Sequence, residues 1–314
     1  MAIPFTQLVA ATYDDVVNEK NKAADQWSDS SFLKGLDKLG GVKRVPGGAT
    51  LQVTLDYKAN PGADFLATDA TATSTTKTEV MTAASYSMIP LVVPTNWSFF
   101  DEAVNSEKNQ KVDLVAAIVD NALASHDQAI EDAIFALTGG TDGMNCLVDL
   151  LSENGEGTVG TIVSGTETWW KNQFKDWGTD TGATLLADYT TLYNSCRKGS
   201  GGRKPNVVVG SASQHALYEA CLTANQRFND TNKASGGFTE LMFKDIPYLF
   251  TSEYTSDSSW MFNTMDTQLY VVMSAWRQRR KVQDHVNAAM SNMKIFSVCQ
   301  LATRNRSRGG VLFT

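Results

Sequence analysis

The sequence predicts an α+β fold made of a long β-hairpin, one unusually long helix, and a second half in which helices and strands alternate. Apolar and polar residues alternate along 51–57, and β-forming residues dominate 80–93, which indicates two paired strands. Apolar residues recur at helical spacing along 107–137. From residue 185 onward, short helical and extended stretches follow one another.

The composition is that of a globular protein. The chain has 314 residues, of which 42% are hydrophobic and 19% are charged, and this length predicts two domains or one domain with elaborations. No apolar run approaches the ~18 residues of a membrane-spanning helix. The N-terminus lacks the basic and apolar parts of a secretory signal. Four scattered cysteines without a Cys-x-x-Cys pair favour small core residues in a reducing compartment.

The net charge of −7 hides an uneven distribution. Residues 270–314 contain eight Lys or Arg residues and one Asp, a net charge of +7, whereas the other residues, 19 basic and 33 acidic, carry −14. A basic segment on an acidic body is typical of nucleic-acid binding or of charge pairing between copies. In a strand, Arg304, Arg306 and Arg308 would share one face. We expect many of these arginines, together with Arg277, Arg279 and Arg280, to face acidic groups of the same or a neighbouring copy.

The first half is predicted in three parts. Residues 5–26 have modest helical amphipathicity, and the glycine pairs Gly40–Gly41 and Gly47–Gly48 precede the hairpin. The hairpin tip, 67–79, consists almost entirely of Ala, Thr, Ser and Asp and should be exposed. Arms of ~14 residues would reach about 45 Å. Since an isolated two-stranded ribbon is marginally stable, we expect this hairpin to pack on a surface outside its own domain.

The strongest helical pattern, 107–137, would be about 46 Å long, well above the mean for globular proteins. Its apolar stripe includes His126, whereas Asp113, Asp120, Asp127 and Glu131 lie on the other side. In the second half we expect a helix at 185–197, a buried strand at 207–209, and a helix from the Ser211/Gln214 capping box to about Arg227. Further strands are predicted at 246–251, 260–263, 268–273, 293–303 and 311–313.

Patterns of known catalytic chemistry are missing from the sequence. It has no phosphate-binding GxxxxGK[ST] loop, no GxSxG elbow and no HExxH motif. The acids of the long helix lack the Glu-x-x-His spacing of a carboxylate metal site, which favours a face exposed to solvent or turned towards a neighbour. Trp169–Trp170 could stack on bases or sugars, although such a pair more often fills a core or an interface. We therefore predict no catalytic residue, cofactor or metal.

Four collinear motifs resemble the tailed-bacteriophage major capsid proteins of the Hong Kong 97 (HK97) type. They are the segment 47–57 with Asn60, which is similar to the opening of an extended loop; Trp170-Lys-Asn-Gln173; Gln226-Arg-Phe228 with Phe238 and 243–247; and 261–270 with the closing 304–312. Each motif is short, but together they span nearly the whole chain.

The resemblance implies the HK97-like capsid fold in five segments. These are an N-terminal arm (1–46), an extended hairpin loop that reaches a neighbouring subunit (47–96), a peripheral domain with the spine helix 107–137 (97–149), an axial domain (150–258), and C-terminal strands shared by both domains (259–314). Fewer than 50 residues precede the hairpin, so we expect a separate scaffolding protein. Lys58 and Lys77 lie in the hairpin, but we expect no covalent crosslinking of the shell.

The function that this resemblance implies is geometric. Copies of the chain would form pentamers and hexamers of an icosahedral phage head, assembled in the bacterial cytoplasm, around double-stranded DNA that is contacted without sequence specificity. Portal and decoration proteins are further expected partners, and no membrane is. The alternatives are an encapsulin-like compartment of the same fold, or a cytosolic enzyme or nucleic-acid-binding protein with an unrecognised site.

We expect specific residues to serve assembly. The glycines Gly40, Gly41, Gly47 and Gly48 are hinge candidates for expansion of the shell. The candidates for subunit interfaces come from the hairpin, the strand after it, the tryptophan pair and the basic C-terminal segment: Leu51, Val53, Leu55, Tyr57, Thr73, Lys77, Met88, Trp97, Trp170, Arg277, Arg279, Arg280, Arg304, Arg306 and Arg308.

Overall fold

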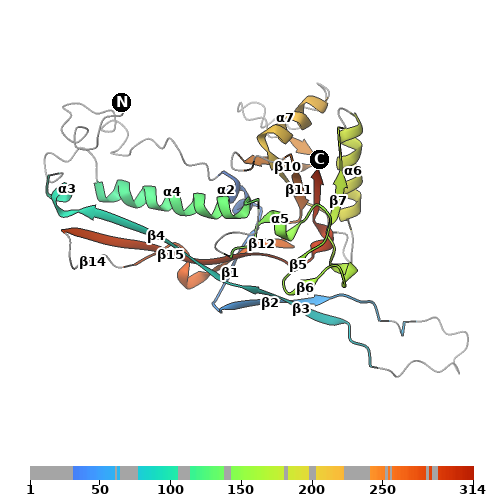
Figure 1. The fold of residues 1–314 in the computed structure, drawn as a ribbon, viewed down its shortest axis with the longest axis horizontal. Coiled ribbons are helices and arrows are strands. Elements are labelled where there is room, and N and C mark those ends of the chain that lie inside the picture. Colours follow the sequence, from blue (N-terminus) through green and yellow to red (C-terminus); the bar gives the residue numbers. More distant parts are fainter. Residues whose placement is uncertain are drawn as a thin grey trace, which may run out of the picture.

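The protein is elongated, with a β-hairpin projecting from one end of a two-sheet body (Figure 1). This computed structural model describes residues 31–314 except 61, 64–76, 105–113, 138–142, 180–182, 198–202, 223–240, 252–253, 255–256, 281–282 and 285–288. The predicted N-terminal helix, most of the hairpin tip with Thr73, and the motif Gln226–Phe228 lie outside the described residues. Within the described residues, no helix is both long enough and apolar enough to cross a membrane.

One long strand, β15 (Met290–Thr303), organises the first sheet. Along one edge, its residues 290–299 pair antiparallel with β4 (Ile89–Ser98). Along its other edge it pairs in turn with three shorter strands, and the outermost strand β1 pairs parallel with one of these, β12. These remaining strands are β1 (Val42–Val45), β12 (Thr267–Val272), β13 (Gln278–Arg279) and β14 (Gln283–Asp284).

The helix α4 (Leu114–Ile134) runs along β4 and β15 (Figure 1). Its apolar stripe meets the two strands in a small core formed by Trp97, Val119, Ala122, Met293 and Ile295. The described helix is shorter than predicted: 107–113 lie outside the described residues, and the helix ends at Ile134 instead of 137. The reason is that Phe135 turns inward and packs edge-on against Phe32, 4.8 Å between ring centroids, whereas Leu137 is exposed.

The second sheet has the order β7-β16-β11-β8-β10-β9, with α6 (Ala183–Cys196) and α7 (Ala212–Cys221) packed against it. The central strand β8 is buried at all five positions, which explains its continuous apolar run. Val207 and Val209 face the core shared with the first sheet, and Val208 faces the helices. The strands are β7 (Gln173–Asp176), β8 (Val207–Ser211), β9 (Met242–Phe243), β10 (Ile246–Thr251), β11 (Ser259–Phe262) and β16 (Gly310–Phe313).

The predicted cap of α7 is confirmed, because Ser211 Oγ accepts a hydrogen bond from the backbone N–H of Gln214 at 3.2 Å. The predicted end of this helix near Arg227 is wrong. Leu222 already has an extended backbone, with φ −81° and ψ 137°, and the helix stops at Cys221.

The hairpin consists of β2 (Thr50–Asp56) and β3 (Met81–Ser87), paired antiparallel from Thr50↔Ser87 to Asp56↔Met81. The alternation of residues 51–57 is confirmed, since Val53 and Leu55 are buried between exposed neighbours. The prediction of one continuous second arm over 80–93 is wrong. The chain leaves the hairpin after Ser87 and starts β4 at Ile89, which belongs to the long sheet.

Short elements connect these parts. They are α2 (Ser31–Lys38), α3 (Phe99–Val104), α5 (Leu147–Leu150), β5 (Thr158–Val159), β6 (Ile162–Val163), and the 3₁₀ turns η3 (Thr168–Trp170), η4 (Met273–Ala275) and η5 (Arg306–Arg308).

Candidate functional site

The base of the hairpin is fastened to its own chain by the β5–β6 ribbon. The backbone N–H of Ser85 donates to Gly160 O at 2.9 Å. Gly160 has φ +59°, and a Cβ there would lie 2.7 Å from the Cβ of Ala84, so only glycine permits this approach. Tyr86, 3% exposed, donates through its hydroxyl to Thr303 O at 2.9 Å. The hairpin base therefore packs within its own subunit, which corrects the expectation of a surface entirely outside its domain.

The tryptophan pair belongs to this junction. Trp170 is 2% exposed and donates through Nε1 to Val159 O at 3.0 Å, so it fills the core, as one interpretation of the sequence expected. Trp169 is half-buried, lies 5.2 Å from the ring of Tyr57, and donates to Glu167 Oε2 at 2.6 Å. The Trp169 side chain therefore packs between Tyr57 of the hairpin and the body of the protein.

Arg306 connects several residues of the neighbouring segment 150–164 through hydrogen bonds. Its side chain is fully buried. The guanidinium donates hydrogen bonds of 2.7 to 2.9 Å to the backbone carbonyls of Leu150 and Glu156 and to the hydroxyls of Ser152 and Ser164. Burial lowers the pKa of Arg306 to about 10. The expectation that Arg306 faces an acidic group is wrong, because backbone and hydroxyl oxygens satisfy its donors instead.

The predicted alternation of Arg304, Arg306 and Arg308 along a strand is also wrong, since 306–308 form a 3₁₀ turn. Arg308 Nη1 lies 3.3 Å from Asp266 Oδ2, as expected of an arginine that faces an acid. Arg203 Nη1 lies 3.6 Å from the other oxygen of Asp266. Asp266 is nearly buried and therefore serves as the shared counter-ion of two arginines.

An open cleft of about 350 Å³ lies between the hairpin and this ion-pair cluster. Asp56 and Tyr57 contribute to its hairpin wall, and Arg203, Asp266 and Arg304 to its body wall. On the far side of Tyr57 and Trp169, a second groove of about 450 Å³ is lined by Glu79, Met81, Ile162 and Val163, among others. Met81 and Val163 are 67% and 48% exposed, so this groove presents apolar surface to its surroundings.

His126 anchors α4 to the long sheet. In the buried imidazole, Nδ1 lies 3.1 Å from Asp127 Oδ1 and Nε2 lies 2.7 Å from Ser297 Oγ. The position of His126 on the apolar stripe of the long helix is therefore confirmed, since its side chain is buried and both ring nitrogens have partners. Arg277 donates its backbone N–H to Ser297 Oγ at 2.8 Å and its guanidinium to Asp127 at 2.7 Å, so Arg277 faces an acid as expected. Arg280 lies over the ring of Phe296, and Arg279 is exposed.

Glu131 is not on a solvated face, which corrects that expectation. The side chain is fully buried and accepts hydrogen bonds from Leu33 N–H at 3.3 Å and from the Thr251 hydroxyl at 3.4 Å. Asp120, on the same helix, is exposed as expected. No local pattern distinguishes these two carboxylates, because the partners of Glu131 lie 98 and 120 residues away.

The remaining interface candidates fall into two groups. Val53, Leu55, Trp97 and Trp170 are buried within the chain, as are Arg306 and Arg308, so their side chains offer little surface to a neighbour. Leu51, Tyr57 and Met88 are half-buried, and the exposed candidates are Lys77, Arg277, Arg279, Arg280 and Arg304.

The hinge candidates have distinct geometries. Gly40, Gly47 and Gly48 have φ of +75°, +153° and +126°, which favours glycine. Gly41 is constrained by packing, because a Cβ there would lie 2.4 Å from a methyl group of Leu36.

The described residues contain no cluster of three or more metal-ligating side chains, and all four cysteines are free thiols. Sequence reasoning missed the ion-pair set of Arg203, Asp266 and Arg308. Of these three residues, Arg308 is the one that lies in the arginine-rich C-terminal segment.

No protein-family model and no curated protein sequence matches the chain. Several solved structures, in contrast, are similar to the chain. The capsid of cyanophage A-1(L) is 15% identical with a TM-score of 0.65, over 93% of this chain and 94% of that one. The capsid of Myoviridae phage XM1 is 14% identical with a TM-score of 0.59, over 99% and 98%. A virus-like particle from Pyrococcus furiosus is 12% identical with a TM-score of 0.50, over 90% and 96%. The chain therefore has the HK97-type capsid fold, as the sequence predicted.

Proposed function

We propose that this chain is the major capsid protein of a tailed phage and that its copies form the pentamers and hexamers of an icosahedral head around double-stranded DNA. One observation carries the proposal: phage capsid structures match nearly the full length of both chains. The solved structures similar to this chain are capsids, which supports a structural role and not an enzymatic one.

The parts of the fold then take the following roles. The segments 1–46 and 47–96 are the N-terminal arm and the extended loop, and α4 is the spine of the peripheral domain 97–149. The second sheet carries the axial domain 150–258, and the strands of 259–314 serve both domains. This division is supported by the sheets, because β11 and β16 lie in the second sheet whereas β12 to β15 lie in the first.

Assembly takes place in the bacterial cytoplasm with a separate scaffolding protein, and the completed virion adds portal and decoration proteins. Among the interface candidates, we assign direct subunit contacts to the exposed ones, with Arg304 in the cleft beside the hairpin and Lys77 on the projecting arm. The glycines of 40–48 serve as hinges between the body and the hairpin.

Sedimentation velocity and negative-stain electron microscopy of the purified chain test the proposal. We expect pentamers, hexamers or closed shells, and the proportion of protein in them should increase with protein concentration. Because assembly is expected to need a separate scaffolding protein, a monomer alone does not contradict the proposal, whereas a stable 34 kDa monomer with an enzymatic turnover would contradict it.

A second candidate is an encapsulin-like compartment, because the matching virus-like particle spans 90% of the chain. The content of particles purified from the native source separates the two functions. Ultraviolet absorbance typical of nucleic acid and a nuclease-protected genome support the phage head. Particles that contain a cargo protein and no nucleic acid support the compartment.

A further inference from the structure

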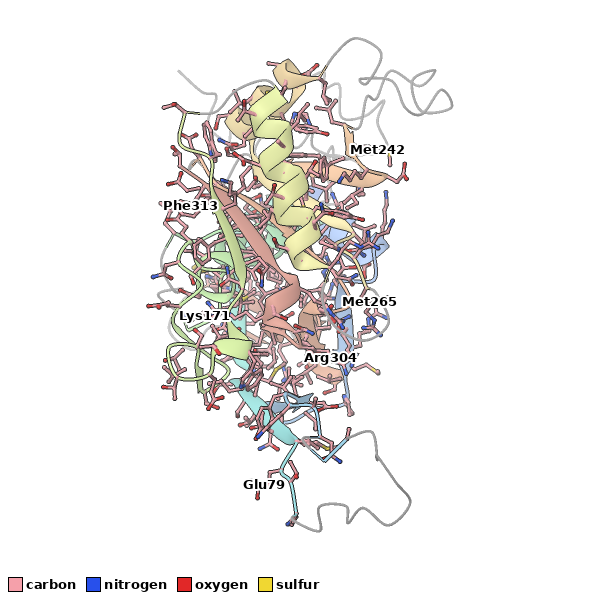
Figure 2. The ribbon with its side chains drawn as sticks, turned by 90° about the vertical axis from the view of Figure 1, so that its right-hand side faces the viewer. Glu79, Lys171, Met242, Met265, Arg304 and Phe313 are labelled. Atoms are coloured by element: carbon pink, nitrogen blue, oxygen red, sulfur yellow. The ribbon has the colours of Figure 1, made fainter. Side chains whose placement is uncertain are left out.

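Two charged side chains, one on either side of the contact between Tyr57 and Trp169, have no counter-ion within the described part of the subunit. The guanidinium of Arg304 lines the cleft and is exposed, although Arg203 and Arg308 beside it both pair with Asp266. The carboxylate of Glu79 lines the groove on the other side, where its backbone carbonyl is fixed by the Tyr57 hydroxyl at 3.2 Å. Figure 2 shows Arg304 on the body and Glu79 on the projecting arm.

The surroundings of the two residues differ in a complementary way. The Arg304 cleft is open, mostly polar and lined by the edge of the hairpin. The arm next to Glu79 carries the strongly exposed side chain of Met81 and the charge of Lys77. The cleft also contains Asp56, which offers a counter-charge for Lys77.

We infer that neighbouring copies meet head to tail, with the Glu79 arm of one copy seated in the Arg304 cleft of the next. This inference rests on the proposed function. A contact between two different surfaces of the same chain is heterologous, and it closes into a ring when the rotation between copies allows it. The pairing of Glu79 with Arg304 would give each copy of a ring one such contact on either side. Met81 would then be covered by the same neighbour.

The cleft suits a carboxylate better than a nucleic-acid backbone. Proteins that hold DNA through its phosphates use several cations without opposing acids. Here the two guanidinium groups of Arg203 and Arg304 share the cleft with the carboxylates of Asp56 and Asp266. Arg203 pairs with Asp266, so Arg304 is the guanidinium of the cleft without an acidic partner among the described residues, and this position suits one acidic side chain.

A charge swap tests the contact. The variants are Arg304→Glu, Glu79→Arg and the double variant, and the measurement is the concentration at which half of the protein sediments as pentamers, hexamers or shells. We expect each single reversal to raise this concentration about tenfold, since like charges then face each other, and the double variant to return within about twofold of the original. A double variant that assembles no better than the single variants would overturn the inference.

Three controls separate the possible causes. Arg197→Glu reverses an exposed arginine at the end of α6 and should leave assembly unchanged, whereas an equal loss there would overturn the specific contact. Thermal unfolding should be the same for all variants, which excludes misfolding. If the unaltered chain forms rings or shells and the reversals have no effect, the inference fails while the proposed function stands. If the unaltered chain forms no higher species, neither in isolation nor when it is expressed together with its scaffolding protein, the proposed function fails.

Binding of a short labelled DNA duplex identifies the competing partner. We expect Arg304→Glu to leave duplex binding unchanged. A loss of duplex affinity without a loss of assembly would assign the cleft to DNA and overturn the inference.

Discussion

Glu131 of α4 accepts a hydrogen bond at 3.3 Å from the backbone N–H of Leu33, in the first turn of α2. The contact satisfies one of the N–H groups that every helix start leaves without an intrahelical partner. The same carboxylate accepts the hydroxyl of Thr251 from β10. One buried side chain therefore joins the long helix, the start of the described chain and the second sheet.

Glu131→Ala should destabilise the subunit by about 1–3 kcal/mol, because it leaves the Leu33 N–H and the Thr251 hydroxyl without this acceptor in a buried site. The free energy of unfolding in urea measures the effect. Asp120→Ala, at an exposed position of the same helix, should stay within about 0.5 kcal/mol. Equal effects of the two substitutions would contradict the assigned role.

Arg306→Lys should cost about 2–3 kcal/mol although it keeps the positive charge. An ammonium group cannot reproduce the planar arrangement that reaches four oxygens of the 150–164 segment. Chemical denaturation detects the loss, and Arg304→Lys is the matched control, since Arg304 is exposed. A lysine variant as stable as the original would show that the several donors of the guanidinium group do not contribute to stability.

Gly160→Ala should loosen the hairpin, because the new Cβ would lie 2.7 Å from Ala84. We expect faster hydrogen exchange of the Ser85 amide, which donates to Gly160 O. Gly157→Ala is a close control, since Gly157 has φ +112° and no atom within 4 Å of its added Cβ. This variant carries the backbone strain without the collision and should leave exchange in β3 unchanged. Equal acceleration by both substitutions would attribute the effect to strain alone.

The subunit should lose stability in alkaline solution. Burial raises the pKa of Tyr86, Tyr218 and Tyr248 above the usual value of a phenol. Above pH ~10 the unfolded chain releases these protons while the folded chain keeps them, so the folded state binds more protons and stability falls as pH rises. Each tyrosine contributes a slope of up to ~1.4 kcal/mol per pH unit.

Urea unfolding between neutral pH and the alkaline range measures this slope. Tyr86→Phe removes one of the contributing groups, so its slope should be shallower than that of the original chain. The same variant should be about 1 kcal/mol less stable at neutral pH, because Thr303 O loses its donor. A slope that is unchanged in this variant would contradict the contribution of Tyr86.

The sequence predicted best those features that depend on neighbouring residues. The alternation around Val53 and the cap at Ser211 are local patterns, and both are confirmed. The passage from β3 to β4 was missed because the β-forming run continues through Met88 while its pairing partner changes. The buried contacts of Glu131 and Arg306 join segments more than 90 residues apart, and nothing in the local pattern around either residue marks them.

The position of β15 has a consequence for biosynthesis. This strand holds β4, β12, β13 and β14 in one sheet, yet it consists of residues 290–303 of a chain of 314. Pairing between such distant segments forms only after the intervening chain has been made. A subunit still being translated therefore lacks the strand that completes its long sheet. A chain that stops short of Met290 should therefore leave β4, β12, β13 and β14 without their common partner and should fail to form this sheet.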